Sequence, residues 1–361
     1  MSLCACGEEL ADHFAFCPSC GIDLRSSAEV RGTQPSSSAR SLCRTLRACA
    51  TRTFERLGDD HFAGSVPGEE TYTQLNLQDI RRLHSDRVKV REFQRYEEAR
   101  NGADWEWWFY SGAVGFGMRV QAKRAKRGGG YDLEHVVRST GARQSQLLVQ
   151  DALTAECLPA YVLYNHRNWV PTSESGRAVD CRHGRGEQTQ LGCTIVSALT
   201  VHAVLRTRPV KAAYVRDQSV PWHRLLCDAP RRGRPGLEAA HAKVTGLHHR
   251  GVHDLRAAVR AEIRWVDQDR DRYDATPGYG PWTAAEEPDP EREDQAPWSD
   301  ETEFDRREQE VLGMPVYRGL NEVAGRQLSP LPDRVMAMIH GEAAQPPDAR
   351  VAGAMVVDLS D

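Results

Sequence analysis

The chain has 361 residues, with 47 basic and 51 acidic side chains and a formal net charge of −4. This length allows one large domain or two smaller ones. A chain with a net negative charge is not a generally basic protein that coats nucleic acid. Any nucleic-acid binding therefore has to come from local patches of basic residues. The longest apolar run, 191–205, is too short to span a membrane, and no signal peptide is recognisable. The sequence therefore predicts a cytoplasmic protein without a membrane anchor.

The first 24 residues hold two pairs of cysteines, in the stretches CACG and CPSCG. Ten cysteines in a long chain without an export signal argue against a disulfide scaffold. Two short turns with four thiolates suit a tetrahedral structural Zn²⁺, and this segment is similar to a small zinc ribbon. The first pair departs from that pattern, because it is Cys-x-Cys rather than Cys-x-x-Cys. We predict zinc ligands at Cys4, Cys6, Cys17 and Cys20, the alternative being four reduced cysteines.

A closed four-ligand zinc site has no open position for chemistry. The segment 1–24 is therefore expected to be a folding module or a docking site for a protein partner. Residues 25–66 follow as a Ser-rich linker and a basic amphipathic helix, whose apolar side includes Leu42, Leu46, Phe54 and Leu57. This helix either packs on a core or contacts nucleic acid or a partner, and packing is the favoured interpretation.

Residues 67–275 are predicted to form one α/β domain. Helices are expected at 67–83 and 141–156, and strands at 87–94 and 159–165. Two more strands, 103–111 and 118–124, would form a hairpin between the first strand and the second helix. The order strand, strand, strand, helix, strand indicates a mixed sheet flanked by helices. The run 191–205 is predicted to be a helix with Cys193 in the core.

Residues 276–361 are predicted to be an acidic linker followed by a short tail. The segment from Glu286 to Glu310 carries twelve acidic residues and three arginines, which is typical of a disordered linker. The tail ends in the strand-like run from Ala352 to Leu359.

The predicted hairpin carries polar residues among bulky apolar ones. Alternation places Asp104 and Glu106 on one face, and Gln121 and Lys123 share a face of the return strand. A turn near Ala113 or Val114 would set Asp104 across from Lys123 and Glu106 near Gln121. Such groups on a half-buried sheet need partners or a metal ion. They are either a structural ion pair of Asp104 with Lys123 or the ligands of a hard divalent cation that could activate a water for phosphodiester hydrolysis.

Asp104, followed after sixteen residues by Gln-Ala-Lys, resembles the PD-(D/E)xK restriction-endonuclease-like superfamily. The likeness is to the Mrr-type variant, in which Gln-x-Lys replaces Glu-x-Lys. The preceding stretch EARNGAD, which begins at Glu98, is similar to the Glu-x-x-x-Gly-Ala-Asp of some bacterial defence nucleases. The surrounding sequence, from about Glu69 to Ala198, resembles an uncharacterised bacterial family of unknown function.

The superfamily resemblance implies a restriction-endonuclease-like α/β fold and a role for each matching residue. Asp104 would be the central ligand of Mg²⁺ or Mn²⁺, and Gln121 a neutral ligand beside it. Lys123 would orient the attacking water or stabilise the transition state. Glu98 would be the additional acidic ligand, with Glu70 on the preceding helix as the competing candidate.

The resemblance also implies a function, namely metal-dependent hydrolysis of DNA in defence against foreign DNA. Gln144, early on the following helix, would contact the site or the DNA backbone. A basic cluster of Lys123, Arg124, Lys126 and Arg127 would contact phosphates. The alternative is a non-catalytic zinc-ribbon protein that binds nucleic acid or a partner on a degenerate nuclease fold. The sequence leaves the oligomeric state open.

Two further clusters carry weaker signals. His248, His249 and His253 could form a transition-metal site, although exposed histidines are the simpler interpretation. Cys181 and His183 suggest a thiol nucleophile with a base, but the sequence places no third group to orient them.

Overall fold

The structure is a computed structural model that separates into two units, Met1–Arg40 and Ser41–Asp361. In the first unit β1 (Ser2–Leu3) pairs antiparallel with β2 (Glu9–Leu10). The four cysteines predicted to bind zinc there lie outside the described residues. The structure describes residues 2–3, 9–10, 41–92, 105–137, 140–170, 181, 183, 186–207, 210–227, 236–274, 301–342 and 351–360, without the side chains of 2–3, 9–10, 263–274 and 301–304.

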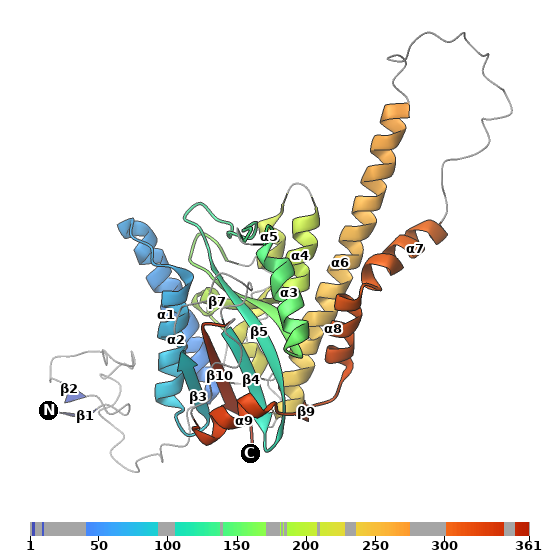
Figure 1. Cartoon of the computed structure of the whole chain (residues 1–361). Coiled ribbons are helices and arrows are strands. Elements are labelled where there is room, and N and C mark those ends of the chain that lie inside the picture. Colours follow the sequence, from blue (N-terminus) through green and yellow to red (C-terminus); the bar gives the residue numbers. More distant parts are fainter. Residues whose placement is uncertain are drawn as a thin grey trace, which may run out of the picture. The chain divides into compact units, whose positions relative to one another are not determined.

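The second unit is built on an eight-stranded mixed sheet, in the order β3-β10-β4-β5-β6-β7-β8, with β9 paired to the start of β5 (Figure 1). The pairs β10–β4 and β5–β6 are parallel, and the others are antiparallel. The predicted mixed sheet flanked by helices is confirmed. The strands are β3 (Val88–Glu92), β4 (Trp105–Ser111), β5 (Val114–Arg124), β6 (Cys157–Tyr164), β7 (Cys193–Ser197), β8 (Val220–Pro221), β9 (Ser329–Pro330) and β10 (Gly353–Asp358).

Helices cover both faces of this sheet. One core lies under α1, α2, the short helix η4 and the first half of α6, and a second lies under α3, α4, α5, α8 and the second half of α6. Figure 1 shows α1 and α2 on the opposite side of the sheet from α3 and α4. The helices are α1 (Leu42–Ala63), α2 (Glu69–Leu83), α3 (Gln144–Thr154), α4 (Ala198–Arg206), α5 (Ala212–Gln218), α6 (Leu237–Asp274), α7 (Glu301–Leu312), α8 (Pro315–Gly325) and α9 (Asp333–His340), with 3₁₀ turns η3 (Gln188–Gly192) and η4 (Trp222–Leu226).

The C-terminal strand β10 is an interior strand of the sheet. It lies between β3 and β4, antiparallel to the first and parallel to the second. The α/β unit therefore extends past residue 275, where the sequence analysis ended it. Residues Glu301–Leu312 form α7, so the prediction of a disordered linker is wrong for the last part of the acidic segment.

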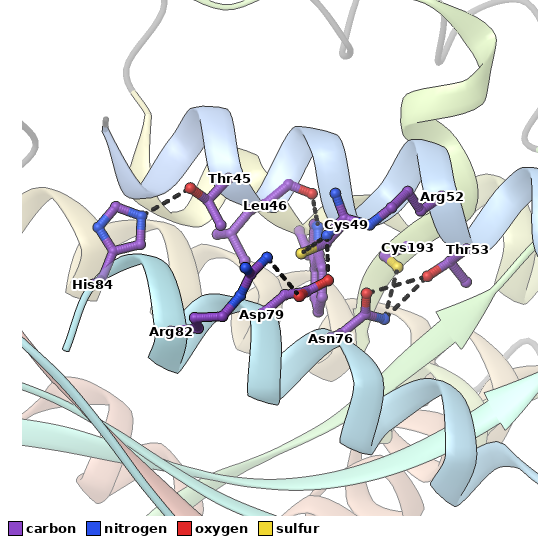
Figure 2. A network of polar contacts seen from close by, with 11 residues as sticks. Thr45, Leu46, Cys49, Arg52, Thr53, Asn76, Asp79, Arg82, His84 and Cys193 are labelled. Atoms are coloured by element: carbon purple, nitrogen blue, oxygen red, sulfur yellow. Dashed lines mark hydrogen bonds and ion pairs between the residues drawn. The ribbon is translucent and has the colours of Figure 1, made fainter. Parts of the chain in front are cut away.

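The helix α1 packs on the core through the apolar side that its sequence predicts, and polar contacts join it to α2 (Figure 2). Thr45 Oγ1 lies 2.8 Å from His84 Nε2, and Asn76 Nδ2 donates to Thr53 Oγ1 at 3.0 Å. Arg52 pairs with Asp79 at 2.6 Å on the outer side. These contacts fix α1 and α2 side by side as one layer on the sheet.

The run 191–205 is half strand and half helix, which corrects the prediction of a single helix. Cys193 begins β7, where β-branched residues favour the extended chain. Ser197 then caps α4, because its hydroxyl accepts a hydrogen bond from the backbone N–H of Leu199 at 3.2 Å. Cys193 is fully buried, as predicted for a core residue.

Candidate functional site

The hairpin β4–β5 turns one residue earlier than the sequence analysis placed it. Ser111 pairs with Val114, so Gly112 and Ala113 form the turn, and Gly112 takes the positive φ of +61° that suits the first central position of a type II′ turn. Glu106 consequently pairs with Arg119. The expectation that Glu106 lies near Gln121 was wrong by two residues along β5.

Three polar side chains follow one another along one face of β5. Arg119, Gln121 and Lys123 are only 1%, 4% and 8% exposed. The intervening Val120 and Ala122 point to the opposite face and pack in the core under α1 and α2. The period-two alternation predicted for this strand is therefore present, and it places a polar row on the side covered by α3.

Arg119, at one end of the row, belongs to a closed network of charges. Its guanidinium lies 3.0 Å from Glu106 Oε2 and 3.4 Å from Asp151 Oδ2 on α3. Arg334 on α9 reaches the other oxygen of Glu106 at 3.2 Å, and the indole N–H of Trp108 donates to the same oxygen. Two carboxylates thus face two guanidinium groups, which compensates charges that would otherwise be costly to bury.

Gln121 and Lys123, at the other end, are bound differently. Gln144, the first residue of α3, donates from Nε2 to Gln121 Oε1 at 2.9 Å, and Gln121 Nε2 donates to the Ala122 carbonyl at 3.2 Å. The contact expected for Gln144 is present. Within the described ranges, no hydrogen bond or ion pair reaches the Lys123 ammonium. We call Gln121, Lys123 and Gln144 the lysine site.

The start of α3 adds to the lysine site. Gln144 Oε1 and Ser145 Oγ are buried oxygen atoms without a hydrogen-bond partner in the part of the chain that the structure describes. The N-terminus of a helix carries partial positive charge, so this end of α3 favours an anion. Together, the Lys123 ammonium and this helix end favour an anion, such as a phosphate oxygen, beside β5.

The acidic residues predicted for this site are not among its described contacts. Asp104 and Glu98 lie outside the described residues; in the sequence, Asp104 comes directly before β4, whose first residue Trp105 pairs with Val120. Glu70 is exposed on α2. Because the buried side of α2 packs on the opposite face of the sheet from Lys123, the structure does not bring Glu70 together with the lysine site.

The histidines of α6 do not form a metal-binding group with one another among the residues that the structure covers. His248 is buried, and its Nε2 lies 2.9 Å from Asn321 Oδ1 on α8. Burial lowers the pKa of His248, which keeps it neutral. His248 therefore acts as a hydrogen-bonded core residue between two helices.

One group of side chains in the described part could hold a metal ion. The ligand atoms of Cys43, Cys181, His183 and Cys227 all lie within 4.8 Å of one another. The three cysteines are buried and free of disulfides. A hydrogen bond with Cys227 and burial raise the pKa of the Cys43 thiol. We call these four residues the thiol cluster.

Sequence reasoning found only half of the thiol cluster. Cys181 and His183 form a visible Cys-x-His, but Cys43 lies on α1 and Cys227 follows η4, both far from Cys181 in the chain. No local spacing links them. The fold brings them together because α1 packs against η4, where Trp222 Nε1 donates to the Leu46 carbonyl at 2.7 Å.

A family model with the description "Family of unknown function (DUF6615)" matches residues 42–336. The chain belongs to this family. The match begins with α1 and ends inside α9, so it includes the lysine site and the thiol cluster and leaves out the four N-terminal cysteines and β10. Neither the curated proteins nor the solved structures include one that matches this chain. Among the helices described, none combines the length and apolar character needed to cross a membrane.

Proposed function

We propose that this member of the DUF6615 family is a metal-dependent nuclease that hydrolyses phosphodiester bonds of DNA. The observation that carries the proposal is the lysine site. The Lys123 side chain is largely buried, its ammonium has no described partner, and it lies two residues from an amide that Gln144 holds in place. A cation held close to a core in this way would be compensated by a bound phosphate with its metal ion.

A restriction-endonuclease-like fold is part of this proposal. Two features support it, namely the β4–β5 hairpin that carries Gln-Ala-Lys and the α3 crossover that leads to β6, parallel to β5. The proposed function also includes a structural zinc ribbon at Cys4, Cys6, Cys17 and Cys20, supported by the spacing of these residues.

A hard cation needs carboxylate ligands, and the carboxylates described near the lysine site already form ion pairs with arginine. Glu106 and Asp151 both pair with Arg119. The proposal therefore assigns Mg²⁺ or Mn²⁺ to Asp104 and Glu98, with Gln121 Oε1 as a neutral oxygen ligand. It requires the register of β4 to continue by one residue, so that Asp104 follows Trp105 to the side of Gln121. When bound, the metal ion would lower the pKa of a water and neutralise the phosphate.

The chain's own residues then have separate tasks. Lys123 stabilises the charge that develops on the phosphate oxygens, and the start of α3 adds its partial positive charge. Gln144 positions Gln121 through the 2.9 Å hydrogen bond. The basic side chains that follow β5, among them Lys126, would guide the DNA backbone.

The test is plasmid cleavage with Mg²⁺ or Mn²⁺. Lys123→Met keeps the size and apolar stem of the side chain, and we expect it to lower the cleavage rate about 100-fold or more. Asp104→Asn should have an effect at least as large, because it removes a metal ligand. Lys211→Met is the matched control, since Lys211 is exposed at the start of α5. Equal cleavage by wild type and Lys123→Met would refute the catalytic role.

The non-catalytic alternative has one observation in its favour. Every carboxylate described beside the polar row is neutralised by an arginine, as expected if this region served the fold alone. A gel-shift assay in EDTA separates the two functions. An adaptor would bind nucleic acid with no cleavage when metal is restored, and Asp104→Asn would not change either result. A nuclease would bind in EDTA and cut when Mg²⁺ returns.

A further inference from the structure

We propose that Cys43, Cys181, His183 and Cys227 bind one Zn²⁺, which ties the start of α1 to the end of η4 and to the segment that carries Cys181 and His183. This zinc site is separate from the N-terminal cysteines and from the lysine site. Three thiolates and one imidazole are a usual ligand set for structural zinc.

The distances in the thiol cluster fit a tetrahedron around zinc. With Zn–S near 2.3 Å and Zn–N near 2.1 Å, tetrahedral geometry sets sulfur atoms about 3.8 Å apart and sulfur and nitrogen about 3.6 Å apart. Cys43 Sγ lies 3.9 Å from Cys181 Sγ, and His183 Nδ1 lies 3.7 Å from Cys181 Sγ and 3.5 Å from Cys227 Sγ. A disulfide would need about 2.05 Å between sulfurs.

The orientation of His183 also suits a metal ligand. Its Nε2 lies 2.9 Å from Ser41 Oγ, and Ser41 caps α1 by accepting a hydrogen bond from the backbone N–H of Arg44 at 3.3 Å. If Nε2 carries the proton and donates to Ser41, the lone pair of Nδ1 points to the sulfurs. A ligating histidine usually has its other ring nitrogen fixed in this way.

A positive side chain balances the charge of the proposed site. Three thiolates around Zn²⁺ leave one negative charge, which would be costly beside a core. Arg47, one turn along α1 from Cys43, donates from Nη1 to Cys181 Sγ at 3.1 Å, and its Nε donates to Gln190 Oε1 at 3.0 Å. The guanidinium is thus held where it offsets the charge.

A site with four protein ligands has no open position, so this zinc would be structural. Its ligands lie 138 residues apart between Cys43 and Cys181 and 44 residues apart between His183 and Cys227. Joining such distant segments restricts the unfolded chain strongly, and metal binding adds directly to folding stability.

The experiment measures zinc in the full chain with Cys17→Ser and Cys20→Ser, which disables the N-terminal set. We expect close to one zinc per chain by inductively coupled plasma mass spectrometry. Adding Cys43→Ser or His183→Ala should lower this zinc content at least tenfold. Cys49→Ser is the matched control, because Cys49 is equally buried on α1 but lies outside the thiol cluster; it should keep its zinc.

X-ray absorption at the zinc edge, on the chain with only Cys17→Ser and Cys20→Ser, needs no ligand variant and so does not depend on how those variants fold. Three sulfur ligands and one nitrogen ligand are expected. Four sulfur ligands, zinc retained by a folded Cys43→Ser chain, or no zinc after purification with added zinc would each overturn the proposal. None of these outcomes depends on nuclease activity.

Discussion

The thiol cluster and the lysine site are both groups of polar side chains in the interior of the fold. They differ in whether their set of metal ligands is complete and in how soft those ligands are. The thiol cluster has three soft sulfur ligands and one imidazole from three segments, all described and within 4.8 Å of one another. The lysine site has an amide and an ammonium, and its carboxylates would come from Asp104 and Glu98. A closed, soft set of ligands suits a metal that holds a fold, whereas an incomplete, hard one suits a metal that meets a substrate.

Arg119 and Lys123 lie on the same face of β5, and we expect their substitution to have different effects on stability. Arg119→Met should destabilise the chain by about 3–5 kcal/mol, because it leaves Asp151 without its described ion pair and Glu106 with one guanidinium fewer. Lys123→Met should cost less than about 1 kcal/mol, since it removes a buried charge that has no described partner. Urea unfolding followed by circular dichroism measures both.

The control for that comparison is Arg326→Met. Arg326 forms an exposed pair with Glu156 at 3.1 Å, so its loss should cost less than about 1 kcal/mol. If Lys123→Met were as destabilising as Arg119→Met, the lysine would belong to the fold, and its assignment to chemistry would fail.

Removing zinc and Mg²⁺ separately tests the difference between the thiol cluster and the lysine site in a second way. Stripping zinc with a strong chelator should lower stability by about 3 kcal/mol when free zinc is 100 times its dissociation constant. Withholding Mg²⁺ alone should stop cleavage and leave the unfolding midpoint unchanged, because a hard, open site binds loosely. Differential scanning calorimetry with each treatment separates the two. An unfolding midpoint that follows Mg²⁺ and ignores zinc would reverse the roles assigned here.

The sequence predicted best what depends on neighbours along the chain. Alternation along β4 placed Trp105 and Trp107 on one face, and the 3.6-residue period of α1 identified its buried side. The strand character of β10 was also recognisable. Its position between β3 and β4 was not, because strand order depends on contacts between residues more than two hundred positions apart.

The candidate sites show the same limit. Gln121, Lys123 and Gln144 were found because a local motif and the following helix carry them. The role of Glu106 was missed because a single glycine, Gly112, turns the hairpin one residue early and shifts the register by two. Cys43 and Cys227 were missed as ligands because both lie far from Cys181 and His183 in the sequence.

A pH effect on folding has to be separated from any pH effect on cleavage. Burial, together with Arg206 and Arg143, lowers the pKa of His202 to about 4, and its Nε2 lies 3.0 Å from the hydroxyl of Tyr317. A histidine with a folded pKa below its unfolded value of 6.5 binds fewer protons in the folded state, so stability falls as pH drops from 6.5 to about 4 and then levels off. Allowing for partial exposure, the loss is at most about 2 kcal/mol.

His202→Gln removes this titration, and its stability should change less between pH 7 and pH 4.5 than that of wild type. Urea midpoints at the two pH values give the comparison. His202 lies on α4 and contacts Tyr317 on α8. A cleavage rate that falls at low pH in both proteins alike would then report on the proposed metal ligands and their water.

The prediction most specific to the lysine site concerns Gln144. Gln144→Ala removes the 2.9 Å hydrogen bond to Gln121 Oε1 and should cost about 1 kcal/mol of stability. If Gln121 is a metal ligand, its amide loses its fixed orientation, and the Mg²⁺ concentration for half-maximal cleavage should rise about tenfold. Gln150→Ala, at an exposed position on the same helix, is the matched control and should change neither quantity. A nuclease whose Mg²⁺ dependence is the same in wild type and Gln144→Ala would place the metal away from Gln121, leaving Lys123 without the neighbour that the proposed mechanism gives it.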